Sequence, residues 1–180
     1  MYENSDRFAV NLEEQSRSFS RVNSVILSQQ ASRFWLPFDV KVFEKLTPRE
    51  YLEKFCKVNN RRHVLYKRTF DKHKDNEGEL PFKFLEEALA DAYMHTIDMT
   101  YITQVIGLLD LPSNTKITFS EFVGIAAFSE RYFFNIFTRQ DNTEPQLQKE
   151  VLEKLDFSSL NWKLAGVNIS PSLRTILRQI

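Results

Sequence analysis

The stretch LLDLPSNTKITFSEF, residues 108–122, decides the fold that the sequence predicts. It leads from the apolar end of one predicted helix, through a polar turn, to the start of another. With Asp110 as the first position of a loop, Ile117 is the eighth and Glu121 the twelfth. Thr118 and Glu121 also have the spacing of a capping box, which satisfies backbone amides at a helix start. The stretch therefore predicts a helix–loop–helix unit with a carboxylate at each end of its loop.

A similar unit precedes this one in the chain. Gly78 and Leu80 are spaced as the sixth and eighth positions of a matching loop, so Phe84 is its twelfth position. Leu80 and Ile117 are then 117 − 80 = 37 residues apart. Apolar residues at helical spacing flank both loops. The sequence predicts four helices, over residues 61–70, 81–94, 98–111 and 119–137.

Together the two units resemble an EF-hand pair, over roughly residues 61–137. The resemblance implies a mainly α fold with a paired helix–loop–helix core and flanking helices. It also implies a short two-stranded ladder that joins the loops through Leu80 and Ile117. In this family loop oxygens at positions 1, 3, 5, 7, 9 and 12 bind calcium, and the helices form a groove for an amphipathic target helix.

The second loop predicts weak calcium binding at most, and no other cofactor. Pro112 at its third position offers no side-chain oxygen, and Asn114 at its fifth is neutral. Thr115 stands where the family has glycine, and we expect a strained positive φ there. The candidate ligands are Asp110, Asn114, Lys116 through its carbonyl, Thr118 and Glu121. Two carboxylates are few for a cation that takes six to eight oxygens.

The first loop lacks its closing carboxylate, because Phe84 occupies the twelfth position. Counting back from Gly78 assigns the first, third, fifth and seventh positions to His73, Asp75, Glu77 and Glu79. Alternatively the loop begins at Asp71 and carries a two-residue insertion. In either register we expect a loop that keeps the EF-hand shape without its bidentate ligand.

Composition argues against several classes of function. Lysines and arginines number 24 and so do the acids, so no overall field favours nucleic acid. No apolar run of about twenty residues predicts a membrane span, and the first residues lack the apolar run of a secretory signal. The single cysteine, Cys56, predicts a reducing, cytoplasmic location. Degenerate EF-hands are frequent in cilia and flagella, which extends this prediction by analogy to the cytoskeleton or cilium.

No residue pattern predicts catalysis. His63, His73 and His95 lack the i, i+4 or cysteine partners of a transition-metal site. Cys56 has no base beside it in the sequence, and glycine-rich phosphate loops, nucleophile elbows and HExxH motifs are missing. We therefore expect a protein that is not an enzyme, with an enzyme subunit or lid domain as the weaker alternative.

The chain divides into three predicted regions. Residues 1–33 form a polar, disordered segment with at most one docking helix, and residues 34–137 form an EF-hand pair with one preceding helix. Residues 138–180 form a helical extension that packs on the core or on a partner. Thr47 and Glu50 form another capping box and predict the start of the preceding helix, which we expect to include Cys56. Ser170 and Pro171 predict a last helix start.

An aromatic face on the last EF-hand helix is the candidate interface. Its residues are Phe128, Tyr132, Phe133, Ile136 and Phe137. We expect the chain's own residues 152–167, LEKLDFSSLNWKLAGV, to cover this face, and a protein partner to bind the remaining groove or exposed helices. The leading hypothesis is a non-catalytic adaptor. The alternative is a low-affinity calcium sensor that uses the second loop to regulate a partner. The sequence fixes neither the partner nor the oligomeric state.

Overall fold

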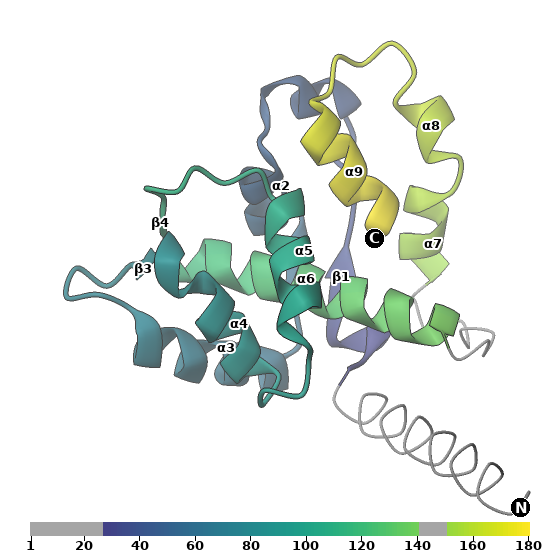
Figure 1. Cartoon of the computed structure of the whole chain (residues 1–180). Coiled ribbons are helices and arrows are strands. Elements are labelled where there is room, and N and C mark those ends of the chain that lie inside the picture. Colours follow the sequence, from purple (N-terminus) through teal and green to yellow (C-terminus); the bar gives the residue numbers. More distant parts are fainter. Residues whose placement is uncertain (1–26, 141–150) are drawn as a thin grey trace, which may run out of the picture.

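The computed structural model describes residues 27–140 and 151–180 of the chain. Within these ranges it is mainly helical, as the sequence predicts, with two small two-stranded sheets (Figure 1). The helices are α2 (Pro48–Lys54), α3 (Asn60–His73), α4 (Leu85–Ala92), α5 (Met99–Leu108), α6 (Phe119–Gln140), α7 (Val151–Phe157), α8 (Leu160–Lys163) and α9 (Pro171–Gln179). Short 3-10 helices are η1 (Gln29–Ala31), η2 (Val40–Lys45) and η3 (Phe82–Phe84). The strands are β1 (Ser32–Phe34), β2 (Cys56–Val58), β3 (Leu80–Pro81) and β4 (Lys116–Ile117).

Local side-chain caps determine where several of these helices begin. The predicted capping box of Thr47 and Glu50 is present at the start of α2. Asn59 caps α3 by accepting a hydrogen bond from the Arg62 amide at 2.9 Å. Ser170 caps α9 as predicted. Each cap satisfies an amide that the first turn of a helix leaves without a partner, so these starts follow from the local sequence.

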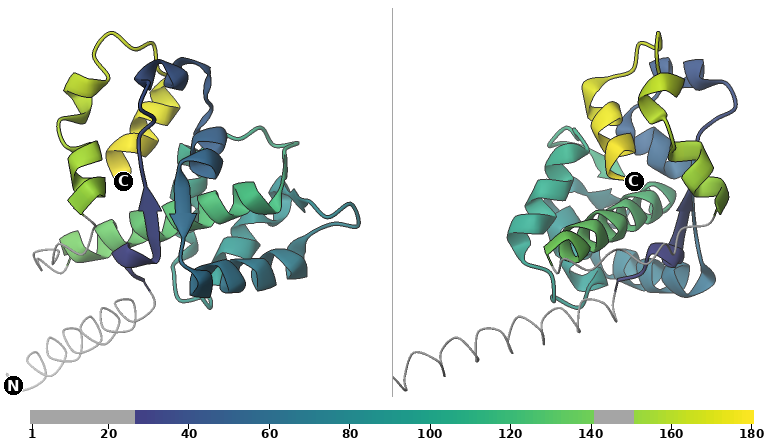
Figure 2. Two further views of the ribbon diagram at one scale, coloured as in Figure 1. Left: turned by 180° about the vertical axis from the view of Figure 1, so that it is seen from behind. Right: turned by 90° about the vertical axis from the view of Figure 1, so that its right-hand side faces the viewer.

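The long helix α6 is the centre of the fold. It contacts α2, α3, α5, α9, β2 and η1, and the views in Figure 2 show it running through the molecule. Gly124 lies where α2 crosses α6: a Cβ atom there would stand 2.3 Å from the Leu52 carbonyl oxygen. The missing side chain is therefore what lets the two helices approach so closely.

The β1–β2 sheet differs from the sequence prediction, which placed Cys56 inside a helix. The helix α2 ends at Lys54, and β2 pairs antiparallel with β1, so that Ser32 lies opposite Val58 and Phe34 opposite Cys56. A three-residue apolar run does not distinguish strand from helix, and the pairing strand lies more than twenty residues upstream. Residues 27–33, predicted to belong to a disordered segment, are ordered, with Leu27 and Ala31 buried. The rest of that predicted segment lies outside the described residues.

The C-terminal region packs on the core through α9 rather than through the predicted residues 152–167. Helix α9 contacts α2, α5 and α6. The buried side chains here are Leu173, Ile176 and Leu177 of α9 and its C-cap residue Ile180. In the predicted segment Leu164 is buried, but Leu152, Leu155 and Trp162 are exposed. The spacing of the α9 anchors, i, i+3, i+4 and i+7, gives one continuous apolar face, which the shorter helices α7 and α8 lack.

Candidate functional site

The two loops are joined in the register that the sequence predicts. Leu80 lies opposite Ile117 in the antiparallel β3–β4 pair, and both side chains are fully buried. The Phe82 amide donates to the Thr115 carbonyl at 2.9 Å and extends the pairing. Two helix–loop–helix units, α3–α4 and α5–α6, are therefore tied together at their loops.

Hydrogen bonds within the first loop hold its acidic residues in place. One carboxylate oxygen of Asp75 accepts from the amides of Glu77 at 2.9 Å and Glu79 at 3.0 Å. Gly78, which follows the turn, has φ +85°, a conformation that glycine adopts without steric cost. The hydrogen bond from the Glu79 amide is the largest of the causes that lower the pKa of Asp75, so this carboxylate is ionised at neutral pH.

A lysine from the second loop is bound to these acids. The Lys116 ammonium lies 3.0 Å from the second carboxylate oxygen of Asp75 and also contacts the carboxylate of Glu77. The hydrogen bonds to Glu77 and then to Asp75 raise the pKa of Lys116 well above its usual value. The two acids are the residues that the EF-hand resemblance assigns to the third and fifth ligand positions. A metal ion would therefore compete with a tethered cation for both of them.

In the second loop, Glu121 has both carboxylate oxygens engaged. One accepts a hydrogen bond from the Thr118 amide at 2.9 Å, as the predicted capping box requires. The other lies 3.4 Å from Nε of Arg49 at the start of α2. Bidentate coordination of calcium by this side chain would have to break both contacts.

The backbone strain expected in the second loop lies at a different residue. Asp110, directly after the C-cap of α5, has φ +52°, whereas Thr115 is not among the described residues with positive φ. A left-handed residue commonly ends a helix, and aspartate tolerates that conformation better than β-branched threonine does. The prediction of strain at Thr115 was therefore wrong, because the chain turns at Asp110 instead.

The five predicted metal ligands follow one another along the chain from the end of α5 to the start of α6. Asp110 ends α5, Asn114 lies in the turn that the Thr115–Pro112 backbone hydrogen bond closes, and Lys116 lies in β4 with its ammonium bound to the first loop. Thr118 and Glu121 contact each other at the start of α6. In residues 27–140 and 151–180 no group of three or more His, Cys, Asp or Glu residues is placed to hold a metal ion.

The predicted interface residues are covered by other parts of the chain. Phe128 and Phe133 are fully buried, and Tyr132, Ile136 and Phe137 are half-buried. Phe133 meets Tyr93 edge-on with ring centroids 5.4 Å apart, and Phe137 meets Tyr101 at 5.7 Å. This face of α6 therefore forms part of the core of the described protein.

Two consecutive charged residues of α6, which the sequence analysis did not single out, are buried. Glu130 accepts hydrogen bonds from the backbone amide of Ser28 at 3.1 Å and the Tyr66 hydroxyl at 2.9 Å, and its carboxylate lies 2.6 Å from the Arg62 guanidinium. Burial is the largest effect on the pKa of Glu130 and raises it. Glu130 thus ties the start of the described chain to α3.

Arg131 and Glu153 form an ion pair that attaches α7 to the core. Their side chains are 0% and 2% exposed. One guanidinium nitrogen of Arg131 donates to the Gln29 and Ser32 carbonyls at 2.9 and 3.0 Å, and the guanidinium stacks over the Phe34 ring at 5.2 Å. The Phe34 amide donates to Glu153. The pair thus satisfies the outer edge of β1, where a third strand would otherwise bind.

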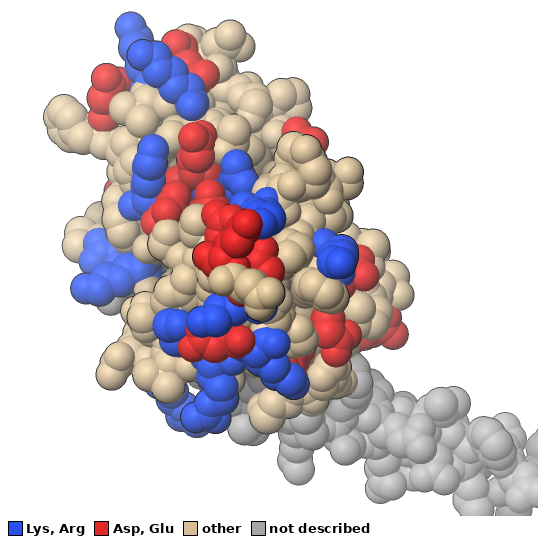
Figure 3. Space-filling view, turned by 90° about the vertical axis from the view of Figure 1, so that its left-hand side faces the viewer, with Lys and Arg blue, Asp and Glu red and all other residues tan. Residues whose placement is uncertain are grey.

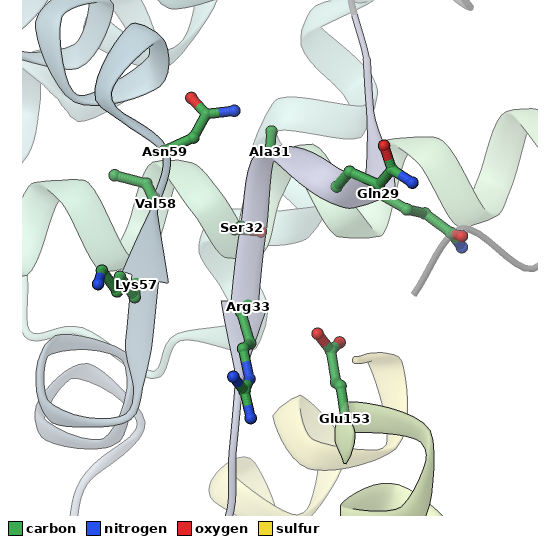
Figure 4. A pocket seen from close by; sticks show the side chains of 9 residues that line it. Gln29, Ala31, Ser32, Arg33, Lys57, Val58, Asn59 and Glu153 are labelled. Atoms are coloured by element: carbon green, nitrogen blue, oxygen red, sulfur yellow. The ribbon is translucent and has the colours of Figure 1, made fainter. Parts of the chain in front are cut away.

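A cleft of about 450 Å³ opens beside this pair (Figure 4). It is lined by Gln29, Gln30, Ala31, Ser32, Arg33, Lys57, Val58, Asn59 and Glu153. The only carboxylate in this lining, Glu153, is already paired with Arg131. In the adjoining strand, burial raises the pKa of the Cys56 thiol well above its usual range, which keeps the thiol protonated at neutral pH.

Charge does not single out a nucleic-acid surface on the side of the paired loops. In Figure 3, which views this side, blue Lys and Arg side chains alternate with red Asp and Glu. On α3 and α4, ion pairs join Lys67 with Asp71 and Lys72 with Asp91. Interspersed charges produce no broad field of one sign. None of the described helices is long and apolar enough to span a membrane.

No protein-family model, curated protein or solved structure matches this chain.

Proposed function

We propose that this chain is a non-catalytic, EF-hand-like interaction module whose calcium binding is weakened or lost, and that it acts as an adaptor or structural subunit in the cytoplasm. The observation that carries the proposal is the position of Lys116. Its ammonium forms ion pairs with the carboxylates of Asp75 and Glu77. These acids belong to the first loop, whose twelfth position holds Phe84 in place of a carboxylate. A tethered ammonium neutralises these acids without an ion from solution, which favours a loop pair that keeps its shape in the absence of calcium.

The groove of the loop pair is an unfavourable site for a partner because α9 already occupies the space between α2, α5 and α6. Each of the four buried aliphatic residues of α9 and its C-cap contributes about 1.5–3 kcal/mol of burial free energy. A partner helix would have to replace these contacts, whereas the exposed apolar side chains of α7 and α8 lie outside the buried core. We name Val151, Leu152, Leu155 and Trp162 the α7–α8 face and assign partner binding to it.

A capture experiment with the full chain as bait tests this proposal. Leu155→Asp places a charge on the α7–α8 face, and Val64→Asp makes the matched change on the opposite side of the core, on α3. The two side chains are 58% and 52% exposed, so neither substitution disrupts packing strongly. We expect a protein that binds the wild type and Val64→Asp but is lost from Leu155→Asp, equally in calcium and in EGTA.

Other results would contradict the proposal in distinguishable ways. Binding that needs calcium and is lost in Glu121→Gln would instead identify a calcium sensor that uses the second loop. Equal binding by both surface variants would overturn the assignment to the α7–α8 face. A cytoskeletal or ciliary location stays a prediction, which the identity of a captured partner would test.

A further inference from the structure

The α7–α8 face consists of large apolar side chains that are exposed to solvent. Val151, Leu152, Leu155 and Trp162 are 70, 58, 58 and 80% exposed. They are four of the ten large exposed apolar residues in the described ranges. Scattered apolar residues are ordinary on a surface, but four on consecutive helices are typical of a binding surface.

The chain enters its folded part near α7, next to the buried Glu153 of that helix. The Ser28 amide donates to Glu130, and the Gln29 carbonyl accepts from Arg131, whose guanidinium is paired with Glu153 on α7. Twenty-six residues precede Leu27. A flexible segment of that length spans about 25–30 Å, and a helix of that length spans about 39 Å. The N-terminal segment can therefore reach α7 and α8, and its tether gives it an effective concentration in the millimolar range.

The sequence of this segment carries one apolar stripe at helical spacing. Its members are Phe8, Leu12, Phe19, Val22 and Ile26, separated by four, seven, three and four residues. At 100° per residue they fall within one face, which also contains Gln15, and the opposite face carries Val10, Arg17, Ser20 and Ser24. A stripe of this kind is what a helix needs in order to lie on an apolar surface.

We propose that residues 8–26 dock as an amphipathic helix on the α7–α8 face of their own chain and compete there with a protein partner. The inference rests on the proposed function for its regulatory consequence only, because docking itself is measurable without a partner. Phe8, Leu12 and Phe19 cover Leu155 and Trp162, and a partner must displace them. The N-terminal segment thereby sets the threshold for partner binding.

Fluorescence of Trp162 in the full chain tests the proposal. Trp35→Phe leaves Trp162 as the only tryptophan and keeps an aromatic ring against Phe55. In this background, Leu12→Asp with Phe19→Asp breaks the stripe, and Ser20→Asp with Ser24→Asp adds the same charge to the opposite face. We expect a shielded, blue-shifted Trp162 in the parent and the control. The stripe variant should shift the emission to the red and raise acrylamide quenching severalfold.

Leu155→Asp provides a second perturbation from the receiving side and should expose Trp162 to the same extent. A Trp162 that is fully accessible in the parent would overturn the proposal, as would equal quenching in the stripe and control variants. Shielding that weakens on dilution would assign the face to a second copy of the chain. Partner loss in Leu155→Asp together with an accessible Trp162 would retain the proposed function and overturn docking alone.

Discussion

Removing the charge of Glu153 should destabilise the protein strongly, although the residue lies on a short helix near the surface. Glu153→Gln keeps the shape of the side chain but leaves the Arg131 guanidinium without its counter-ion. Arg131 is fully buried, and its other hydrogen bonds go to the Gln29 and Ser32 carbonyls, which are neutral and cannot balance its charge.

The expected magnitude follows from the burial of the pair. Breaking a buried ion pair by removing one partner costs about 3–5 kcal/mol of unfolding free energy. With a urea slope of about 2 kcal/mol per molar, the unfolding midpoint should fall by about 2 M. Replacing both charges, with Arg131→Met and Glu153→Leu, should cost less than Glu153→Gln alone. The double variant buries no unpaired charge and loses only the hydrogen bonds to the β1 edge, worth about 0.5–1.5 kcal/mol each.

Urea titrations followed by far-ultraviolet circular dichroism would measure these differences at neutral pH. Asp71→Asn, which removes the charge from an exposed i, i+4 pair with Lys67, is the control and should leave the midpoint unchanged. A loss below about 1 kcal/mol in Glu153→Gln would refute the reasoning, because buried charges without partners do not cost so little. A double variant less stable than either single variant would also refute it.

Two further predictions concern packing and pH. Gly124→Ala should lower the unfolding free energy by about 1–3 kcal/mol in thermal or urea unfolding, because the new Cβ would collide with the Leu52 carbonyl oxygen. The control is Gly107→Ala, where a Cβ meets nothing within 4 Å and which should raise the unfolding free energy by about 0.5–1 kcal/mol. Equal effects of the two substitutions would contradict the close approach of α2 and α6. Burial holds the pKa of Glu130 above its ordinary value of 4.5, so the folded state binds this proton more tightly than the unfolded state does. The unfolding free energy should therefore fall as pH rises through the window just above pH 4.5, and Glu130→Gln should remove that part of the slope in urea titrations at successive pH values; an unchanged slope would refute the assignment.

Much of the paired-loop architecture follows from local signals in the sequence. The phase of Leu80 and Ile117 predicts the β3–β4 register, and Thr47, Thr118 and Ser170 predict three helix starts. These features depend on neighbouring residues: an alternation of apolar positions, or a side-chain oxygen that reaches an amide three residues on. The loop register and these helix starts can therefore be predicted from the sequence before the fold is known.

The parts that could not be predicted depend on contacts between distant segments. The strand at Cys56 needs Ser32–Phe34 beside it, and the C-terminal helix that packs on the core is α9, whereas Leu155 and Trp162 stay exposed. The sequence contains one indication of the buried charges: Glu130 and Arg131 interrupt the apolar run AAFSERYFF near the middle of a predicted helix. Charged residues are rarely buried without partners, so such an interruption predicts a buried pair or a surface stripe, and only the fold distinguishes the two.

Calcium affinity tests the central claim most directly. An isothermal titration of the full chain with calcium, in millimolar magnesium, would be run in parallel on wild type and Glu121→Gln, with folding checked by circular dichroism. The account predicts no saturable heat in the micromolar range for either protein, because Lys116 occupies the acids of the first loop and Glu121 is held by Thr118 and Arg49. Saturable micromolar binding that is lost in Glu121→Gln would contradict it and establish the second loop as a functional calcium site.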